Sequence, residues 1–218
     1  MTRLFLLAGS ALALVAPVAA QTNVRLAEAQ RAAWGRPGST TYRLDNENVR
    51  FSGGRLLQTR FGPVLVAEGK VGTFSHVSPG RVGAFYLTRT PRGLARGRAF
   101  EGAVTGGSMG GIGEWSVSTA FAANPVIYAE GGSTGQGITC SFTTLTELTP
   151  AGPVEMARFQ SYFGDMNASR RETTGKIANI ARDRSFDVIY TGARPGRVRF
   201  VRQGGKYRPQ GRVPLAGC

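Results

Sequence analysis

Two serines in glycine-rich segments are the first residues of this chain whose spacing could support chemistry. Ser108 and Ser133 each occupy the centre of a G-x-S-x-G pattern, at 106–110 and 131–135. That spacing is typical of hydrolases in which a tight strand-to-helix turn exposes a nucleophilic serine. The only histidine, His76, would be the base, yet it precedes both serines and neither pattern runs into a helix-like segment. The spacing therefore favours two turned β-loops, with a secreted hydrolase as the alternative.

A pair of glutamates offers a second possible chemistry. Glu101 and Glu114 could form the acid pair of a glycosidase, with Trp115 stacking on a sugar ring. Trp115, however, lies on the apolar face of an alternating segment, and Glu114 is its outward neighbour. The pattern therefore favours a core tryptophan and a solvated glutamate, and the glycosidase-like pair stays an alternative.

Metal and cofactor chemistry has few candidate residues. The chain has one histidine and only two cysteines, Cys140 and Cys218, whereas a structural zinc site usually takes about four Cys, His or carboxylate ligands. The sequence contains no P-loop and no dinucleotide-binding pattern. We therefore expect no metal and no cofactor, and we expect the two cysteines to form one intramolecular disulfide.

Basic residues gather near the carboxyl terminus. If the Gly-Gly pair at 204–205 is a hairpin turn, one face presents four cations: Arg197, Arg199, Lys206 and Arg208. The opposite face then holds Val198, Phe200, Arg202 and Tyr207, of which all but Arg202 suit a core. Arg194 in the preceding turn and Arg212 beyond the hairpin extend the basic region.

Such a face suits an anionic partner, because guanidinium groups bind carboxylates and phosphates through paired hydrogen bonds. The candidates are an acidic glycan, a lipid headgroup and an acidic envelope protein. Nucleic acid is less expected, since no binding fold or stacking motif supports it. An alternative of equal weight is a solvated arginine face that Asp183 and Asp187 partly neutralise.

The charge is unevenly divided along the chain. Of the 27 Lys and Arg residues none lies in 100–157, which holds five glutamates, and the whole chain has a net charge of +14. Basic segments therefore flank an acidic centre. A strongly basic chain is attracted to polyanions and anionic surfaces, but its charge says nothing about its fold.

Residues 1–20 have the pattern of a cleavable secretory signal, with a cationic start, an apolar core at 4–15 and small residues at 18–20. The apolar run is shorter than the roughly 20 residues that span a bilayer. No second run approaches that length. We expect a bacterial export signal, a periplasmic or secreted location, and one β-rich domain over 21–218.

Strand-like segments and turns alternate from residue 40 onwards. Period-two runs at 114–121 and 138–148 are the clearest, and further strands are expected at 42–44, 64–71, 74–77, 82–90, 186–191, 197–203 and 206–210. A Gly-Gly turn at 53–54 is expected to join strands 49–52 and 55–60. Helices are expected at 24–34 and, behind a capping box at 169–172, at 177–181. The class is all-β, an antiparallel sandwich or barrel with one or two short helices.

These patterns favour an exported, non-enzymatic domain of the cell envelope that binds an anionic partner through its basic surface. A secreted hydrolase using Ser108 or Ser133 with His76, or Glu101 with Glu114, is the first alternative. A structural subunit of an envelope complex is the second.

Overall fold

The computed structural model describes residues 18–167, 171–215 and 218. Most of the predicted signal peptide, residues 1–17, lies outside this part. Helix α1 (Val18–Trp34) confirms the helix predicted at 24–34. It ends where Gly35 takes a φ of 81° and its N–H donates to the Arg31 carbonyl oxygen at 2.8 Å. Within the described residues, no helix has the length and apolar character needed to cross a membrane.

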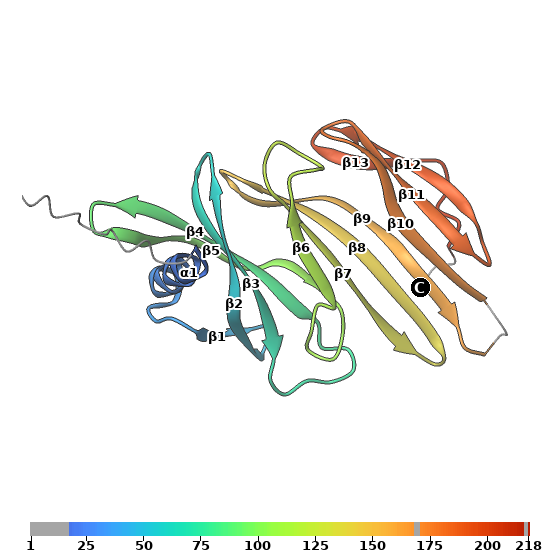
Figure 1. Ribbon diagram of the computed structural model, residues 1–218. Coiled ribbons are helices and arrows are strands. Elements are labelled where there is room, and N and C mark those ends of the chain that lie inside the picture. The colour runs from blue at the N-terminus through green and yellow to red at the C-terminus, as the bar shows by residue number, and fades with distance from the viewer. Residues whose placement is uncertain (1–17, 168–170, 216–217) are drawn as a thin grey trace, which may run out of the picture.

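The other elements are antiparallel strands in two sheets (Figure 1). The first sheet contains, in order, β1 (Ser39–Leu44), β2 (Glu47–Thr59), β3 (Gly62–Val71), β4 (Gly80–Thr90) and β5 (Gly93–Gly106). The second contains, in order, β6 (Glu114–Ser118), β7 (Val126–Gly135), β8 (Ile138–Thr149), β9 (Gly152–Asp165), β10 (Arg171–Ala181), β11 (Ser185–Gly192), β12 (Gly196–Gln203) and β13 (Lys206–Gln210). Within each sheet every strand pairs with the next one in the chain, so successive turns alternate between two ends.

The sheets pack against each other through a buried apolar cluster. Val64 and Val82 from the first sheet meet Ile127 and Leu148 from the second, and all four are fully buried. This arrangement confirms the all-β class and makes it sandwich-like. β4, which confirms the strand expected at 82–90, lies at its centre, because every residue from Gly80 to Leu87 is buried.

The remaining faces have cores of their own. α1 covers the far side of the first sheet, where Trp34 meets Phe85 edge to face with ring centroids 5.7 Å apart. On the second sheet Phe186 stacks on Phe200 at 4.9 Å and meets Phe121 edge to face at 5.7 Å. The sheet bends around this aromatic core, so that β13 also contacts β9.

The predicted disulfide is present. Cys140 in β8 is bonded to Cys218, with Cα atoms 6.3 Å apart. Cys140 is buried, and the Gln160 side-chain amide of β9 donates to the Cys218 sulfur at 2.9 Å. The bond therefore attaches Cys218 to the start of β8, the third strand from the β6 edge of the second sheet.

The hairpin predicted at 53–54 is wrong, because β2 continues through it. Gly53 and Gly54 have φ values of 60° and 107° and form a bulge between Ser52 and Arg55 in the pairing with β3. A Cβ at Gly54 would lie 2.7 Å from the Val66 carbonyl oxygen, so the glycine permits close strand approach and not a turn.

The helix predicted at 177–181 and the strand predicted at 74–77 are also wrong. Residues 171–181 form β10, which pairs with β11 on one side and β9 on the other. Gly175 fits this strand because the Tyr190 ring covers it, leaving only 2.5 Å to a Cβ. Tertiary pairing thus overrides a weak helical pattern. Residues 72–79 form a loop between β3 and β4.

Candidate anion-binding surface

The hairpin of β12 and β13 has the predicted register. Gln203 pairs with Lys206, Val201 with Arg208, and Arg199 with Gln210. The buried face carries Val198, Phe200 and Tyr207, all at most 4 % exposed. The other face exposes Arg197, Arg199, Lys206 and Arg208. Each cation of β13 lies opposite a neutral residue, so the register avoids direct like-charge pairs across the hairpin.

β10 and β11 extend this face. Lys176 pairs with Ile189, which pairs with Arg197, so the three side chains lie in one row across the sheet. Lys176 is exposed. The sequence pattern did not place Lys176 on this face, because it predicted a helix at 177–181 behind the capping box at 169–172. We call Lys176, Arg197, Arg199, Lys206 and Arg208 the basic outer face.

One buried carboxylate lies within this face. Asp187 of β11 pairs with Arg199 in register, and its side chain is 2 % exposed. Asn179 donates to its Oδ2 at 2.8 Å, and Arg197 Nη2 donates to the same oxygen at 2.6 Å. Asn179 reaches it from the bulge of β10, where its φ is 50°. Asp187 thus neutralises Arg197, as the solvated-face alternative expected.

The hydrogen bond from Asn179, helped by the bond and charge of Arg197, lowers the pKa of Asp187 against the opposing effect of burial. Because the folded pKa lies below the unfolded value of about 3.9, the ionised carboxylate stabilises the fold at neutral pH. That contribution is lost as the pH falls through the folded pKa.

Replacing Asp187 with asparagine should therefore reduce the loss of stability in acid. Urea unfolding at about pH 7 and about pH 3 measures this loss, which should be larger in the wild type. Glu155→Gln removes the same charge from an exposed site and should leave the loss as in the wild type. Equal losses in Asp187→Asn and wild type would contradict the assignment.

Four exposed cations of the face, Lys176, Arg199, Lys206 and Arg208, have no carboxylate partner among the described residues. Arg199 donates only to the Ser185 hydroxyl, at 3.0 Å, and no ion pair involves Lys206 or Arg208. Arg194 is exposed in the turn before β12, and Arg212 is exposed beyond β13. In the part of the chain that the structure describes, neither of these two side chains forms an ion pair. The face therefore offers unneutralised guanidinium and ammonium groups side by side.

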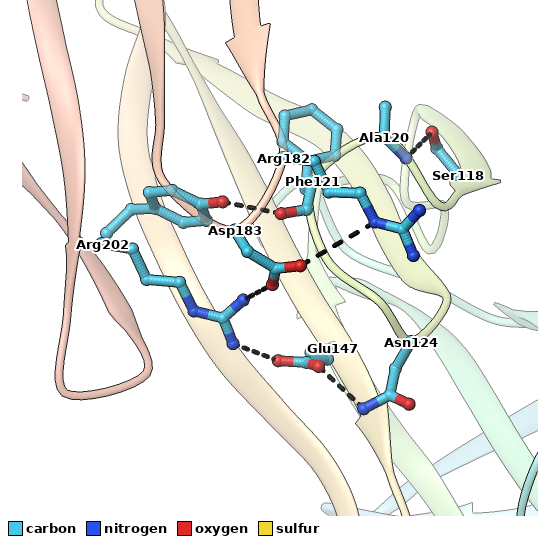
Figure 2. A network of polar contacts seen from close by, with 9 residues as sticks. Ser118, Ala120, Phe121, Asn124, Glu147, Arg182, Asp183 and Arg202 are labelled. Atoms are coloured by element: carbon cyan, nitrogen blue, oxygen red, sulfur yellow. Dashed lines mark hydrogen bonds and ion pairs between the residues drawn. The ribbon is translucent and has the colours of Figure 1, made fainter.

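Arg202 lies on the opposite side of β12, in a polar network at the edge of the aromatic core (Figure 2). Its guanidinium donates to Glu147 Oε2 at 2.9 Å and to Asp183 Oδ1. Asn124 donates to the other oxygen of Glu147 at 2.8 Å. Asp183 is thus engaged on the far side of the sheet from the basic outer face. Arg202 connects β12 to β8 and to the turn between β10 and β11.

The serine motifs do not assemble a catalytic group among the described residues. Ser108 donates its hydroxyl proton to the Gly132 carbonyl oxygen at 2.7 Å, which ties the two glycine-rich segments together. Ser133 is exposed and lines a cleft of about 390 Å³ between the sheets, in which Arg158 is the one charged residue. His76 is exposed in the 72–79 loop, and neither serine is hydrogen-bonded to it in the described part of the chain.

The two glutamates lie in different sheets. Glu101 lies in β5, whereas Glu114 begins β6 and pairs with Glu130 of β7. Glu130 accepts hydrogen bonds from the Tyr128 hydroxyl at 2.6 Å and from Ser161 at 3.0 Å. Burial, followed by that contact with Glu130, raises the pKa of Tyr128 above its ordinary range. Trp115 packs in the core between the sheets, as its alternation predicted.

Over the described ranges, no group of three or more His, Cys, Asp or Glu residues is placed to hold a metal ion. Comparison with protein-family models, with curated proteins and with solved structures finds no match for this chain.

Proposed function

We propose that this protein is an exported, non-enzymatic domain of the bacterial cell envelope that binds an anionic partner through the basic outer face. The observation that carries the proposal is that Arg199, Lys206 and Arg208 share one face of the β12–β13 hairpin, are exposed and lack a carboxylate partner in the described structure. The ion pair with Asp187 holds Arg197 in place and neutralises its charge. Arg197 therefore attracts an anionic partner less than the unpaired cations do.

The chemistry of the face favours an extended anion over an enclosed small molecule. The cations project from adjacent strands of an open sheet, spaced two residues apart along each strand, which is about 7 Å. Phosphates or carboxylates repeated along a glycan, a lipid surface or an acidic protein can meet several of them at once. The net charge of the chain, +14, adds a long-range attraction to such partners.

Changing Arg199 and Arg208 together to glutamine should weaken retention on immobilised heparin. Each exposed ion pair is worth about 0.2–1 kcal/mol, so the pair should lower affinity about 2- to 30-fold. The variant should leave the column at lower salt than the wild type, because surface charges are screened over about 10 Å at 0.1 M. Arg197 is left in place, since its removal would leave the negative charge of Asp187 without its ion-pair partner.

The matched control is Arg25→Gln with Arg31→Gln, which removes the same charge from exposed positions of α1. The control should retain heparin binding close to that of the wild type. If both double variants lose retention equally, net charge alone decides binding and there is no specific face. If neither loses retention, the basic outer face is a solvated surface and the proposal fails.

A further inference from the structure

The exposed apolar side chains are concentrated at one end of the molecule. Because the strands of each sheet are paired in chain order, the 72–79 loop, the 107–113 connection, the 136–137 turn and the segment after β9 all lie at the same end (Figure 1). Seven large apolar side chains are exposed in the described residues, and five belong to these segments: Phe74, Val77, Met109, Ile138 and Met166. We call these five residues the apolar end. Val154 and Ile180 lie at the opposite end.

The segments that carry these side chains have few charges, although the β1–β2 turn at the same end contains Asp45, whose side chain is 83 % exposed, and Glu47 accepts a hydrogen bond from the Ser78 hydroxyl of the 72–79 loop at 2.5 Å. Residues 72–80, 102–113 and 131–146 contain no Asp, Glu, Lys or Arg. The turns at the opposite end include Arg60, Arg92, Arg182, Asp183 and Arg184. In a chain with 18 % charged residues, the contrast identifies a surface suited to an apolar environment.

Several backbone groups of the apolar loops are hydrogen-bonded within the protein. Gly110 N–H donates to the Ser78 carbonyl oxygen at 2.8 Å, and Val71 N–H donates to that of Gly110 at 2.9 Å. Met166 N–H donates to the Gly137 carbonyl oxygen at 2.8 Å. Polar groups that are satisfied internally lower the cost of moving these loops out of water.

The side chains of the apolar end are exposed to solvent. Val77 is 80 % exposed, and Phe74 and Met109 are each 54 % exposed. Met109 has a φ of 51°, which a non-glycine residue adopts at a local cost in free energy. None of the five residues lines the cleft between the sheets or the pocket beside β13. Separate loop tips of this kind suit a broad apolar layer and not a small molecule.

Positive charge lies at the same end of the second sheet, beyond β9 and β10. The turn at 193–195 is at this same end of the second sheet, where Arg194 is exposed and Arg197 begins the basic outer face. Apolar loop tips next to basic residues are the combination that binds the interface of an anionic bilayer, with the apolar groups at the boundary of headgroups and acyl chains.

We infer that the apolar end inserts into the surface of an anionic lipid bilayer, with Phe74, Val77 and Met109 entering the interface, and with Arg194 and Arg197 of the same end of the second sheet contacting headgroup phosphates. The inference deepens the proposed function by naming its anionic partner, and it rests on that function only for the electrostatic part.

The test is co-sedimentation of the exported protein with phosphatidylcholine vesicles, with and without phosphatidylglycerol. Wild type should bind the anionic vesicles much more than the neutral ones. Phe74→Ser with Val77→Ser should lower binding to anionic vesicles at least about tenfold, because transfer of these side chains into the interface is lost. The matched control, Val154→Ser with Ile180→Ser, removes exposed apolar side chains from the opposite end and should change binding by less than about twofold.

Heparin retention separates this inference from the proposed function. The Phe74→Ser/Val77→Ser variant should keep wild-type retention on heparin, and its circular-dichroism spectrum should match that of the wild type, which shows that it is folded. Vesicle binding equal to that of the wild type would overturn lipid insertion while leaving the basic outer face untouched. Absence of wild-type binding to anionic vesicles would overturn it too. So would a wild-type dimer that this variant converts to a monomer, since the apolar end would then be a contact between copies.

Discussion

Replacing Arg202 with methionine should lower the free energy of unfolding by about 3–5 kcal/mol. The side chain of Arg202 is 20 % exposed, and that of its partner Glu147 only 11 %. Without the guanidinium, Glu147 keeps only the Asn124 hydrogen bond (Figure 2). Methionine fills most of the space against Tyr207 but cannot balance the carboxylate. The cost therefore comes from a buried charge that has lost its partner and not from a cavity.

Urea unfolding of the exported protein, followed by circular dichroism, measures this change. Arg208→Met is the control, because it removes the same group from the exposed side of the same hairpin and should change stability by no more than about 0.5 kcal/mol. Adding Glu147→Leu to Arg202→Met should recover part of the loss, since the uncompensated charge is then gone. A cost of less than about 1 kcal/mol for Arg202→Met alone would show that Glu147 is solvated without its partner.

Replacing both cysteines with serine should lower the free energy of unfolding by about 4 kcal/mol. The disulfide joins residues 78 apart in the sequence, and a crosslink over such a span removes much of the conformational freedom of the unfolded chain. It also holds the segment after β13, from which Val213 and Leu215 pack against the aromatic core. Loss of the bond therefore loosens this segment as well.

Reduction of the disulfide with dithiothreitol tests the expected effect of the cysteine substitutions. Wild type unfolded with dithiothreitol should match the Cys140→Ser/Cys218→Ser variant, and dithiothreitol should have no effect on the variant itself. Thiol titration of denatured, non-reduced wild type should find no free thiol. Two free thiols in the exported protein, or equal stabilities of variant and wild type, would contradict the prediction.

Strands with one buried face could be predicted from the sequence, because their side chains alternate between core and solvent. The hairpin at 197–210 formed with the predicted register. The run at 138–148 is also a strand, β8, although residues 143–148 are buried on both faces. Glycine pairs were a less reliable guide to the positions of turns. The pair at 204–205 is a turn with two positive φ values, whereas the same pair at 53–54 is a bulge inside β2. The local sequences do not show which Gly-Gly pair is a turn and which is a bulge. At 53–54 the strand continues because the residues from Arg55 onward pair with β3.

The sequence by itself determined the all-β class, the pairing of the two cysteines and the basic face of the last hairpin. Each depends on local periodicity or on a count of residues, which a single chain displays directly. Only the tertiary structure decided that Lys176 joins this face, that Asp187 neutralises Arg197, and that Arg202 is balanced by Glu147. It also gathered apolar residues from four separate segments at one end of the molecule. These features depend on which strands are neighbours and which turns share an end, and long-range pairing sets both.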